Sequence, residues 1–245
     1  MAAVVPPVRY TVQYVITFTM IVQAHDRGRM ATPRRHHHLS REAIAWAALE
    51  LVDQDGFEAL TLRRVADGLD VGVMNLYTYV RDKNALVRDI VALLLGEIEL
   101  PDDPDMTWEE GVFAVGHSLR AMALRHPRAF RSVALASYDE PAVARYARRV
   151  EATLVGLGFP AELLPQLATV LDSHGTGFLL LETRQVAPPR EDVPGPFDDD
   201  PETSALLHSQ LDPDTAFDDS LRVIVAGFKV VHGLPDGQRR SERAI

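Results

Sequence analysis

The chain has 245 residues, 47% of them hydrophobic, and a formal net charge of −10. This composition supports a sizeable core and excludes global disorder, and the absence of cysteine excludes disulfides, thiolate nucleophiles and thiolate metal sites. The charge is uneven, because residues 27–95 carry ten basic and nine acidic side chains while the residues after 95 carry 14 basic and 25 acidic ones, so only the front part is suited to a polyanion.

Residues 1–38 are predicted to form a poorly ordered extension. The apolar run "VRYTVQYVITFTMIV" at 8–22 is too short and too rich in hydroxyl groups for a membrane span, and no small-residue cleavage site follows it. Met30 is an alternative start, which would make residues 1–29 an artefact of the start site. We therefore expect a cytoplasmic protein with no membrane partner, with a regulator tethered by residues 8–23 as an alternative.

Four helices are predicted between residues 39 and 98. Ser40 is a good N-cap for the first, which Gly56 ends, and Thr61 caps a short second helix that stops near residue 69. The third helix is expected at 73–80, and Asp82 caps the fourth. Two short helices joined by a tight turn are typical of a helix-turn-helix unit, although such pairs also occur in purely structural bundles.

The remainder of the chain is also predicted to be helical. The run "ELPDDPD" at 99–105 reads as a linker, and the proline-rich acidic segment at 187–202 as a mobile loop. Helices are expected near 107–125, 128–137, 141–156, 160–184, 202–210 and 217–232. The prediction is an all-α protein with a helix-turn-helix domain at 39–98, a larger helical domain at 106–234 and a C-terminal tail at 235–245.

The predicted third helix carries polar groups that suit DNA. In a helix-turn-helix unit the second helix lies in the major groove, and its first residues meet base edges. Leu76 and Val80 are expected to face inward, which leaves Asn75, Thr78 and Tyr79 facing outward. The hydroxyl groups of the two tyrosines, at 77 and 79, can reach phosphate oxygens, and Lys83 at the start of the fourth helix adds a positive charge.

The segment "ALTLRRVADGLDVGVMNLYTYVRDKNALV" resembles the DNA-binding domain of the tetracycline-repressor (TetR) family of bacterial transcription regulators. The matching residues are Gly56, Thr61, Leu62, Arg63, Val65, Ala66, Leu69, Val71, Leu76, Tyr77, Val80, Lys83, Ala85 and Leu86. The resemblance implies a homodimer that binds a palindromic operator in double-stranded DNA. It also implies a C-terminal domain that binds a small-molecule effector, whose binding releases the DNA.

The resemblance also implies roles for individual residues. Thr61 and Tyr77 match phosphate contacts, with Lys83 beside them, and Arg63 matches a residue that reaches a base or a phosphate. The recognition surface is expected to comprise Val73, Met74, Asn75, Thr78 and Tyr79. Asp70 stands where the family usually has glycine in the turn, but aspartate tolerates left-handed backbone geometry better than most residues.

Two apolar stripes in the C-terminal part resemble the two helices of the tetracycline-repressor C-terminal domain, which implies that they form a four-helix dimer interface with a second subunit. Residues of 164–181 and 217–228 recur at spacings of three and four, which favours helix-on-helix packing. The expected interface residues are Leu164, Leu167, Leu171, Phe178, Leu221, Ile224 and Phe228. The alternative is that both stripes belong to the core of one chain.

A largely hydrophobic effector is expected to bind between the C-terminal helices. The candidate ligand-binding residues are Trp108, Phe113, His117, Met122, Phe130 and His174. The spacing of the histidines matches no common zinc pattern, so we expect no metal and no cofactor. An apolar residue near Val133 stands where tetracycline-binding members carry a chelating histidine. An all-α enzyme is a further alternative, but the sequence has no glycine-rich phosphate loop, nucleophile elbow or HExxH motif.

Overall fold

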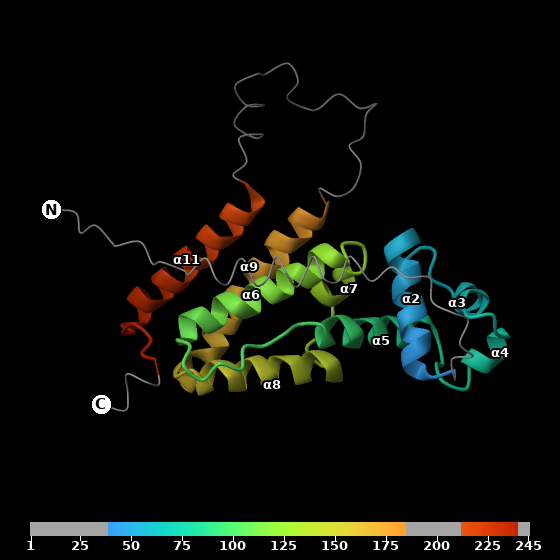
Figure 1. Cartoon of the computed structure of the whole chain (residues 1–245), viewed down its shortest axis with the longest axis horizontal. Helices are drawn as coiled ribbons and strands as arrows, with labels where there is room; N and C mark the ends of the chain where they lie inside the picture. The colour runs from blue at the N-terminus through green and yellow to red at the C-terminus, as the bar shows by residue number, and fades with distance from the viewer. Residues whose placement is uncertain (1–38, 185–211, 240–245) are drawn as a thin grey trace, which may run out of the picture. The chain divides into compact units, whose positions relative to one another are not determined.

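The computed structural model describes residues 39–184 and 212–239, and every regular element in these residues is helical (Figure 1). The elements are α2 (Arg41–Asp55), α3 (Leu62–Gly68), α4 (Val73–Leu76), α5 (Lys83–Gly96), α6 (Trp108–Arg125), α7 (Phe130–Ala134), α8 (Pro141–Gly156), the 3₁₀ helix η1 (Ala161–Leu163), α9 (Leu164–Arg184) and α11 (Pro213–His232). The all-α class is confirmed. The expected extension at 1–38, the loop at 187–202, the helix at 202–210 and the end of the tail lie outside the described residues.

The first helices begin where the sequence provides capping side chains. Ser40 Oγ accepts a hydrogen bond from the N–H of Ala43, and Thr61 Oγ1 accepts one from Arg64. Asp82 Oδ1 accepts the corresponding bond from Ala85, so all three expected N-caps are confirmed.

Four helices differ in extent from the prediction. The helix expected at 160–184 begins as η1 and is α-helical only over α9. The third helix is regular only over α4, and the chain continues to Val80 as a turn in which Leu76 O accepts from Tyr79 and Val80. The helix expected at 128–137 is regular only over 130–134. In contrast, α11 begins four residues before the expected position, because Asp212 caps it and a proline, which needs no N–H partner there, occupies its first position.

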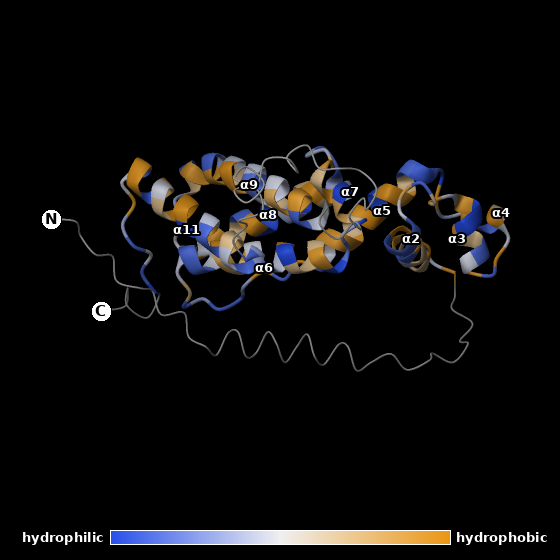
Figure 2. Cartoon of the chain, turned by 90° about the horizontal axis from the view of Figure 1, so that it is seen from above, coloured by the Kyte–Doolittle hydropathy of each residue, from blue (hydrophilic) through white to orange (hydrophobic). Residues whose placement is uncertain are grey.

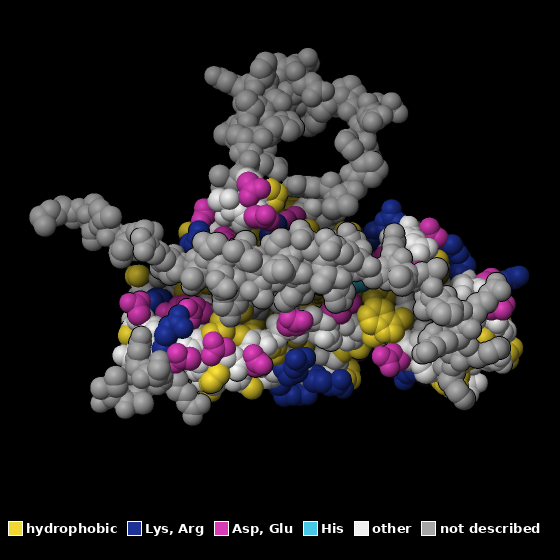
Figure 3. All heavy atoms as spheres, viewed as in Figure 1, with side chains coloured by type: hydrophobic (Ala, Val, Ile, Leu, Met, Phe, Trp, Pro, Cys, Tyr) yellow, Lys and Arg dark blue, Asp and Glu magenta, His cyan; other side chains and the backbone are white. Residues whose placement is uncertain are grey.

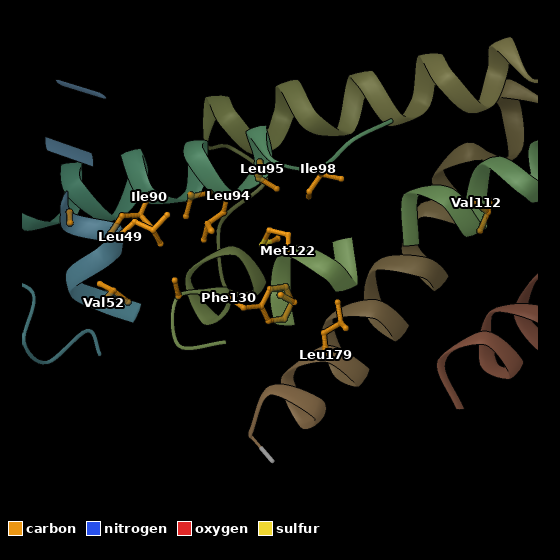
Figure 4. Close-up of a cluster of buried hydrophobic side chains, with 14 of the residues drawn as sticks. Leu49, Val52, Ile90, Leu94, Leu95, Ile98, Val112, Met122, Phe130 and Leu179 are labelled. Atoms are coloured by element: carbon orange, nitrogen blue, oxygen red, sulfur yellow. The ribbon is translucent and has the colours of Figure 1, made fainter. Parts of the chain in front are cut away.

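A continuous apolar core joins the first helices to the C-terminal helices. Helix α5 packs against α2 and also against α7 and α8 (Figure 1). The buried side chains meet where α2, α5, α6, α7 and α9 converge (Figure 4). They include Leu49 and Val52 of α2, Ile90 and Leu94 of α5, Met122 of α6, Phe130 of α7 and Leu179 of α9. Helix α5 therefore packs both against α2 of the helix-turn-helix part and against α7 and α8 of the C-terminal part, and both sets of contacts fix its position.

The last turns of α11 and the segment that follows this helix lie against the first turn of α6. Lys229 Nζ is 2.8 Å from Glu109 Oε1, and the N–H of Gly237 donates to the same oxygen at 2.9 Å. Arg239 contacts Glu110. A side chain at position 237 would meet Glu109, since a Cβ there would lie 2.1 Å from Oε2. This part of the expected tail is therefore fixed closely onto α6.

Within residues 39–184 and 212–239, no helix is both long enough and apolar enough to span a bilayer. The apolar run at 8–22 lies outside these residues.

Candidate nucleic-acid interface and ligand site

The α3–α4 pair forms a compact helix-turn-helix unit. Val65 and Ala66 of α3 and Leu76 of α4 are buried, and the two helices pack together. The turn closes through a hydrogen bond from Val71 N to Ala66 O at 3.0 Å, and Asp70 has a φ of 56°. Asp70 thus adopts the left-handed conformation that the sequence led us to expect.

The predicted DNA contacts are gathered on the outer surface of this unit. Met74 is 73% exposed and Tyr77 51% exposed, which is unusual for large apolar and aromatic side chains. Of the nine residues predicted to contact DNA, Val73 is half-buried. The other eight are exposed: Thr61, Arg63, Met74, Asn75, Tyr77, Thr78, Tyr79 and Lys83. The predicted contact residues therefore form one exposed surface on α3, α4 and the turn that follows α4.

Two of the predicted phosphate contacts also have structural partners. Lys83 Nζ donates to Phe57 O at 2.8 Å, and Thr61 Oγ1 serves as the cap of α3. Each group keeps donor capacity, because an ammonium has three N–H bonds and a capping hydroxyl still has its hydrogen. Arg64, the neighbour of Arg63, is paired with Asp55 at 2.5 Å. Substitution of Lys83 would therefore remove a positive charge from the predicted DNA-binding surface and also a hydrogen bond that holds the local fold.

Acidic and basic side chains occur on both parts of the described chain. Figure 3 shows acidic side chains along the C-terminal helices, side chains of both signs at the α2–α4 end, and basic ones on α8. The α8 group contains the exposed residues Arg145, Arg148 and Arg149.

A second candidate site is an aromatic cluster between α6, α9 and α11, centred on Phe217. The Phe217 ring centroid lies 5.7 Å from that of His117 and 5.2 Å from that of Phe178. His174 stacks against the same ring at 6.4 Å, and Phe113 lies 6.5 Å from His117. Three predicted ligand-binding residues are thus brought together here.

A buried ion pair borders this cluster. Arg120 donates to both carboxylate oxygens of Glu182, with Nε 2.9 Å from Oε2, and its Nη2 lies 2.7 Å from Asp214 Oδ1. The guanidinium carbon is 5.3 Å from the centroid of the Phe217 ring, within cation–π distance. Two carboxylates therefore already neutralise the positive charge of Arg120.

Burial favours the neutral form of both histidines in the cluster. Burial lowers the pKa of His117, although Asp218 at 3.1 Å opposes the shift, and burial lowers that of His174. Ser220 Oγ lies 2.7 Å from Phe217 O and 2.9 Å from His174 Nε2. If Ser220 donates to Phe217 O, then His174 donates from Nε2 and its Nδ1 is a hydrogen-bond acceptor.

The other predicted ligand-binding residues lie elsewhere. Met122 and Phe130 are fully buried in the core around α5 (Figure 4), and their contact with a ligand stays a prediction. Trp108 packs edge-on against Phe159 at 5.0 Å and lines a separate cleft of about 270 Å³ beside residues 234–238. Apolar character alone identified these residues, and it does not distinguish a packed core from a ligand cavity.

Two family models match this chain. A model described as "Bacterial regulatory proteins, tetR family" matches residues 44–90. A model described as "Tetracyclin repressor-like, C-terminal domain" matches residues 100–232, more than half of the chain. The chain belongs to the TetR family.

Individual relatives of this TetR-family chain match only part of it. An HTH-type transcriptional regulator of Saccharopolyspora erythraea is 30% identical over 121 residues, which cover 49% of this chain and 51% of that protein. The HTH-type transcriptional repressor DrrR1 of Streptomyces coeruleorubidus is 31% identical over 107 residues, 42% of this chain and 38% of the repressor. The chain thus spans about half or less of the curated relatives it matches.

The solved structures match over greater lengths. ActR, a TetR-family protein of Streptomyces coelicolor solved in complex with actinorhodin, has a TM-score of 0.64 and 25% identity. The match covers 80% of this chain and 99% of ActR.

The TetR-family chain buries most of the residues expected at its dimer interface. Leu164, Leu167, Leu221 and Phe228 are buried within the chain, and their contact with a second subunit stays a prediction. Leu171, Phe178 and Ile224 are half-buried. A stripe with spacings of three and four marks a face that is covered, but it does not show whether the same chain or another covers it.

A different face of α11 and α9 is apolar and exposed. On α11, Val223 is 71% and Val230 is 83% exposed, and the exposed residues Ala226 and Gly227 lie between them at helical spacing. Figure 2 shows the apolar end of this helix in orange. On α9, which packs against α11, Leu181 is 62% exposed.

Sequence reasoning missed the polar groups of the aromatic cluster. Arg120 continues the stripe of Phe113 and His117 on α6, so its spacing was a usable signal. Its partner Glu182 lies 62 positions away on α9, and no local pattern links the two.

Proposed function

We propose that this chain is a dimeric transcription regulator that binds operator DNA through α3 and α4 and releases it when a small molecule binds at the cluster around Phe217. The observation that carries the DNA-binding half is the outer surface of α4 and of the turn that follows it, where polar, apolar and aromatic groups are exposed together. The relatives in Saccharopolyspora and Streptomyces, which are regulators of transcription, support the same function. Such a protein acts in the cytoplasm and needs no catalytic group.

In this proposal, α4 enters the major groove. Asn75 reads a base edge, since the amide of asparagine pairs with adenine through two hydrogen bonds. Tyr77 and Thr61 contact phosphates on either side, which sets the register without reading sequence. Met74 and Val73 supply apolar contacts suited to the methyl group of thymine.

We expect the Tyr77→Phe variant to bind every duplex about fivefold more weakly, because one hydroxyl–phosphate hydrogen bond is lost. The Asn75→Ala variant should instead lose discrimination between duplexes that differ at one or two base pairs. Fluorescence anisotropy with the DNA upstream of the chain's own gene and with a scrambled duplex measures both effects. Tyr138→Phe, at an exposed tyrosine of the C-terminal part, is the matched control. Equal binding by all four proteins would exclude α4 as the reading helix.

The cluster around Phe217 is suited to an uncharged aromatic compound that carries hydroxyl groups. The aromatic side chains offer stacking surfaces. Nδ1 of His174 offers an acceptor for a hydroxyl donor. An anionic compound is disfavoured, because Glu182 and Asp214 already occupy the guanidinium of Arg120. That ActR is solved with a bound small molecule supports a ligand site in this domain.

We expect hydroxylated polycyclic aromatic compounds to raise the thermal unfolding temperature of the protein more than their O-methyl ethers or carboxylates do. A His174→Phe variant keeps a ring but lacks the acceptor, so it should bind the best hydroxylated compound about tenfold more weakly and its methyl ether equally well. Titration calorimetry on both proteins measures the difference. If His174→Phe weakens both compounds alike, His174 acts only as a packing surface.

A further inference from the structure

An ionic contact joins the end of α6 to α2 and α5. His126, which caps the C-terminus of α6, places Nδ1 2.6 Å from Asp53 Oδ2 on α2. On its other side, Nε2 lies 3.2 Å from Oε1 of Glu97, the C-cap of α5, as an ion pair outside hydrogen-bond geometry. Only 11% of the imidazole side chain is exposed. One side chain therefore holds three helices.

Two neighbouring arginines strengthen the same corner. Arg125 contacts Glu97, and Arg128 donates to the backbone oxygens of Gln54 and of Asp53, the latter at 3.3 Å. These carbonyls lie at the C-terminal end of α2, where the unpaired oxygens and the helix dipole attract positive charge. The residues that connect α6 to α7 therefore bind the end of α2 twice: His126 contacts the Asp53 side chain, and Arg128 donates to backbone oxygens.

The charge of His126 follows from the groups around it. Burial alone would lower the His126 pKa, but the carboxylates of Asp53 and Glu97 outweigh burial and raise it to about 9. Burial would raise the Glu97 pKa, but His126 and Arg125 lower it overall. The other charged group at the corner, Arg128, faces backbone oxygens. The imidazole is therefore charged at neutral pH, and the contact is ionic under physiological conditions.

Helix α6 also carries the ligand cluster. Phe113, His117 and Arg120 lie on it, and nine residues separate His117 from His126, which corresponds to about 13 Å along a helix at 1.5 Å per residue. A helix moves as a rigid element over this length. A displacement of α6 at the cluster must therefore either carry α2 with it or break the contact at His126.

We propose that His126, held between Asp53 and Glu97, is the positioning residue through which α6 sets the placement of α2 and thereby the affinity of the chain for DNA. This inference rests on the proposed function for its DNA-binding part and on geometry alone for the contact. Neutralising His126 frees the end of α2 from α6. The DNA-binding unit then samples more arrangements, and binding must order it again.

The test compares His126→Gln and Asp53→Asn with Arg41→Ala. Gln retains one donor but no charge, and Asn keeps the shape of Asp53, which preserves folding. Arg41 pairs with Asp89 at 2.9 Å and so links α2 to α5 without contacting α6, which makes it a matched control. Amide hydrogen exchange of residues 52–56 reports the end of α2 without DNA, and anisotropy with the upstream duplex reports affinity.

We expect exchange at residues 52–56 to be at least fivefold faster in His126→Gln and Asp53→Asn than in Arg41→Ala or the unchanged protein, and DNA affinity to be about tenfold lower. Unchanged exchange would overturn the contact as a restraint on α2. Faster exchange with unchanged affinity would overturn the coupling. Faster exchange in a chain that binds no DNA even when unsubstituted would leave the restraint standing and refute the proposed function instead.

A measurement on the unsubstituted protein provides an independent check. NMR titration of the imidazole should give one histidine, absent from His126→Gln, with a pKa about 9 rather than near 6.5. Because the folded-state pKa is raised, the stability from this contact is complete below pH 6.5 and is lost as the pH rises through about 9. A His126 pKa near 6.5 would overturn the ionic contact.

Discussion

Replacing Val230 with aspartate should yield a folded monomer whose affinity for operator DNA is about 100-fold lower, or lower still. Val230 is 83% exposed on the stripe of α11 that also contains Val223, while α9 beside it exposes Leu181. Small residues on the stripe, including Gly227, allow close approach of a second helix. A buried aspartate without a partner would prevent this contact. Loss of the second subunit removes the second half-site, and with it an avidity of about 10²–10⁴.

The matched control is Val155→Asp, the same substitution at an exposed valine on α8. Sedimentation velocity at micromolar concentration measures the assembly state, circular dichroism the helix content, and anisotropy the DNA affinity. We expect Val155→Asp to resemble the unsubstituted dimer in all three. A dimeric Val230→Asp protein, or a monomeric unsubstituted one, would place the interface elsewhere or remove it.

The local features of the fold were predictable because they depend on residues a few positions apart. The caps at Ser40, Thr61 and Asp82 each act on an amide three residues ahead, so a short stretch of sequence contains both partners. The turn at Asp70 depends on the conformational tolerance of a single residue. The outward placement of Asn75 follows in the same way from the buried position of Leu76.

The tertiary pairings were not predictable from one sequence. Periodicity correctly marked Leu167 and Leu221 as covered, but the covering surface is the chain's own core. The contact between His126 and Asp53 joins residues 73 positions apart, and each is an ordinary polar residue in its own helix. The aromatic cluster was only partly predictable, because His117 and His174 were candidates while Phe217, at the centre, was not.

Removing one member of the buried ion pair should be among the most destabilising polar substitutions in this chain. Arg120 and Glu182 have side chains only about 10% exposed, and they share at least two hydrogen bonds. Glu182→Ala would leave the guanidinium buried, with Asp214 as its remaining carboxylate partner among the described residues. Because the Asp214 side chain is 82% exposed, water screens its charge and it cannot replace Glu182. We expect Glu182→Ala to lower the free energy of unfolding by about 3 kcal/mol.

Two further proteins distinguish the loss of a partner from the loss of an attraction. Asp214→Ala removes the exposed partner and should cost less than about 1 kcal/mol. The double variant Arg120→Met with Glu182→Leu leaves no buried charge and should recover most of the loss caused by Glu182→Ala, because apolar side chains of similar volume avoid the desolvation of both ions. Urea unfolding of all four proteins at one protein concentration measures these differences, since dimer stability depends on concentration. A double variant as unstable as Glu182→Ala would mean that the pair stabilises the packing of α6 and α9 by direct attraction.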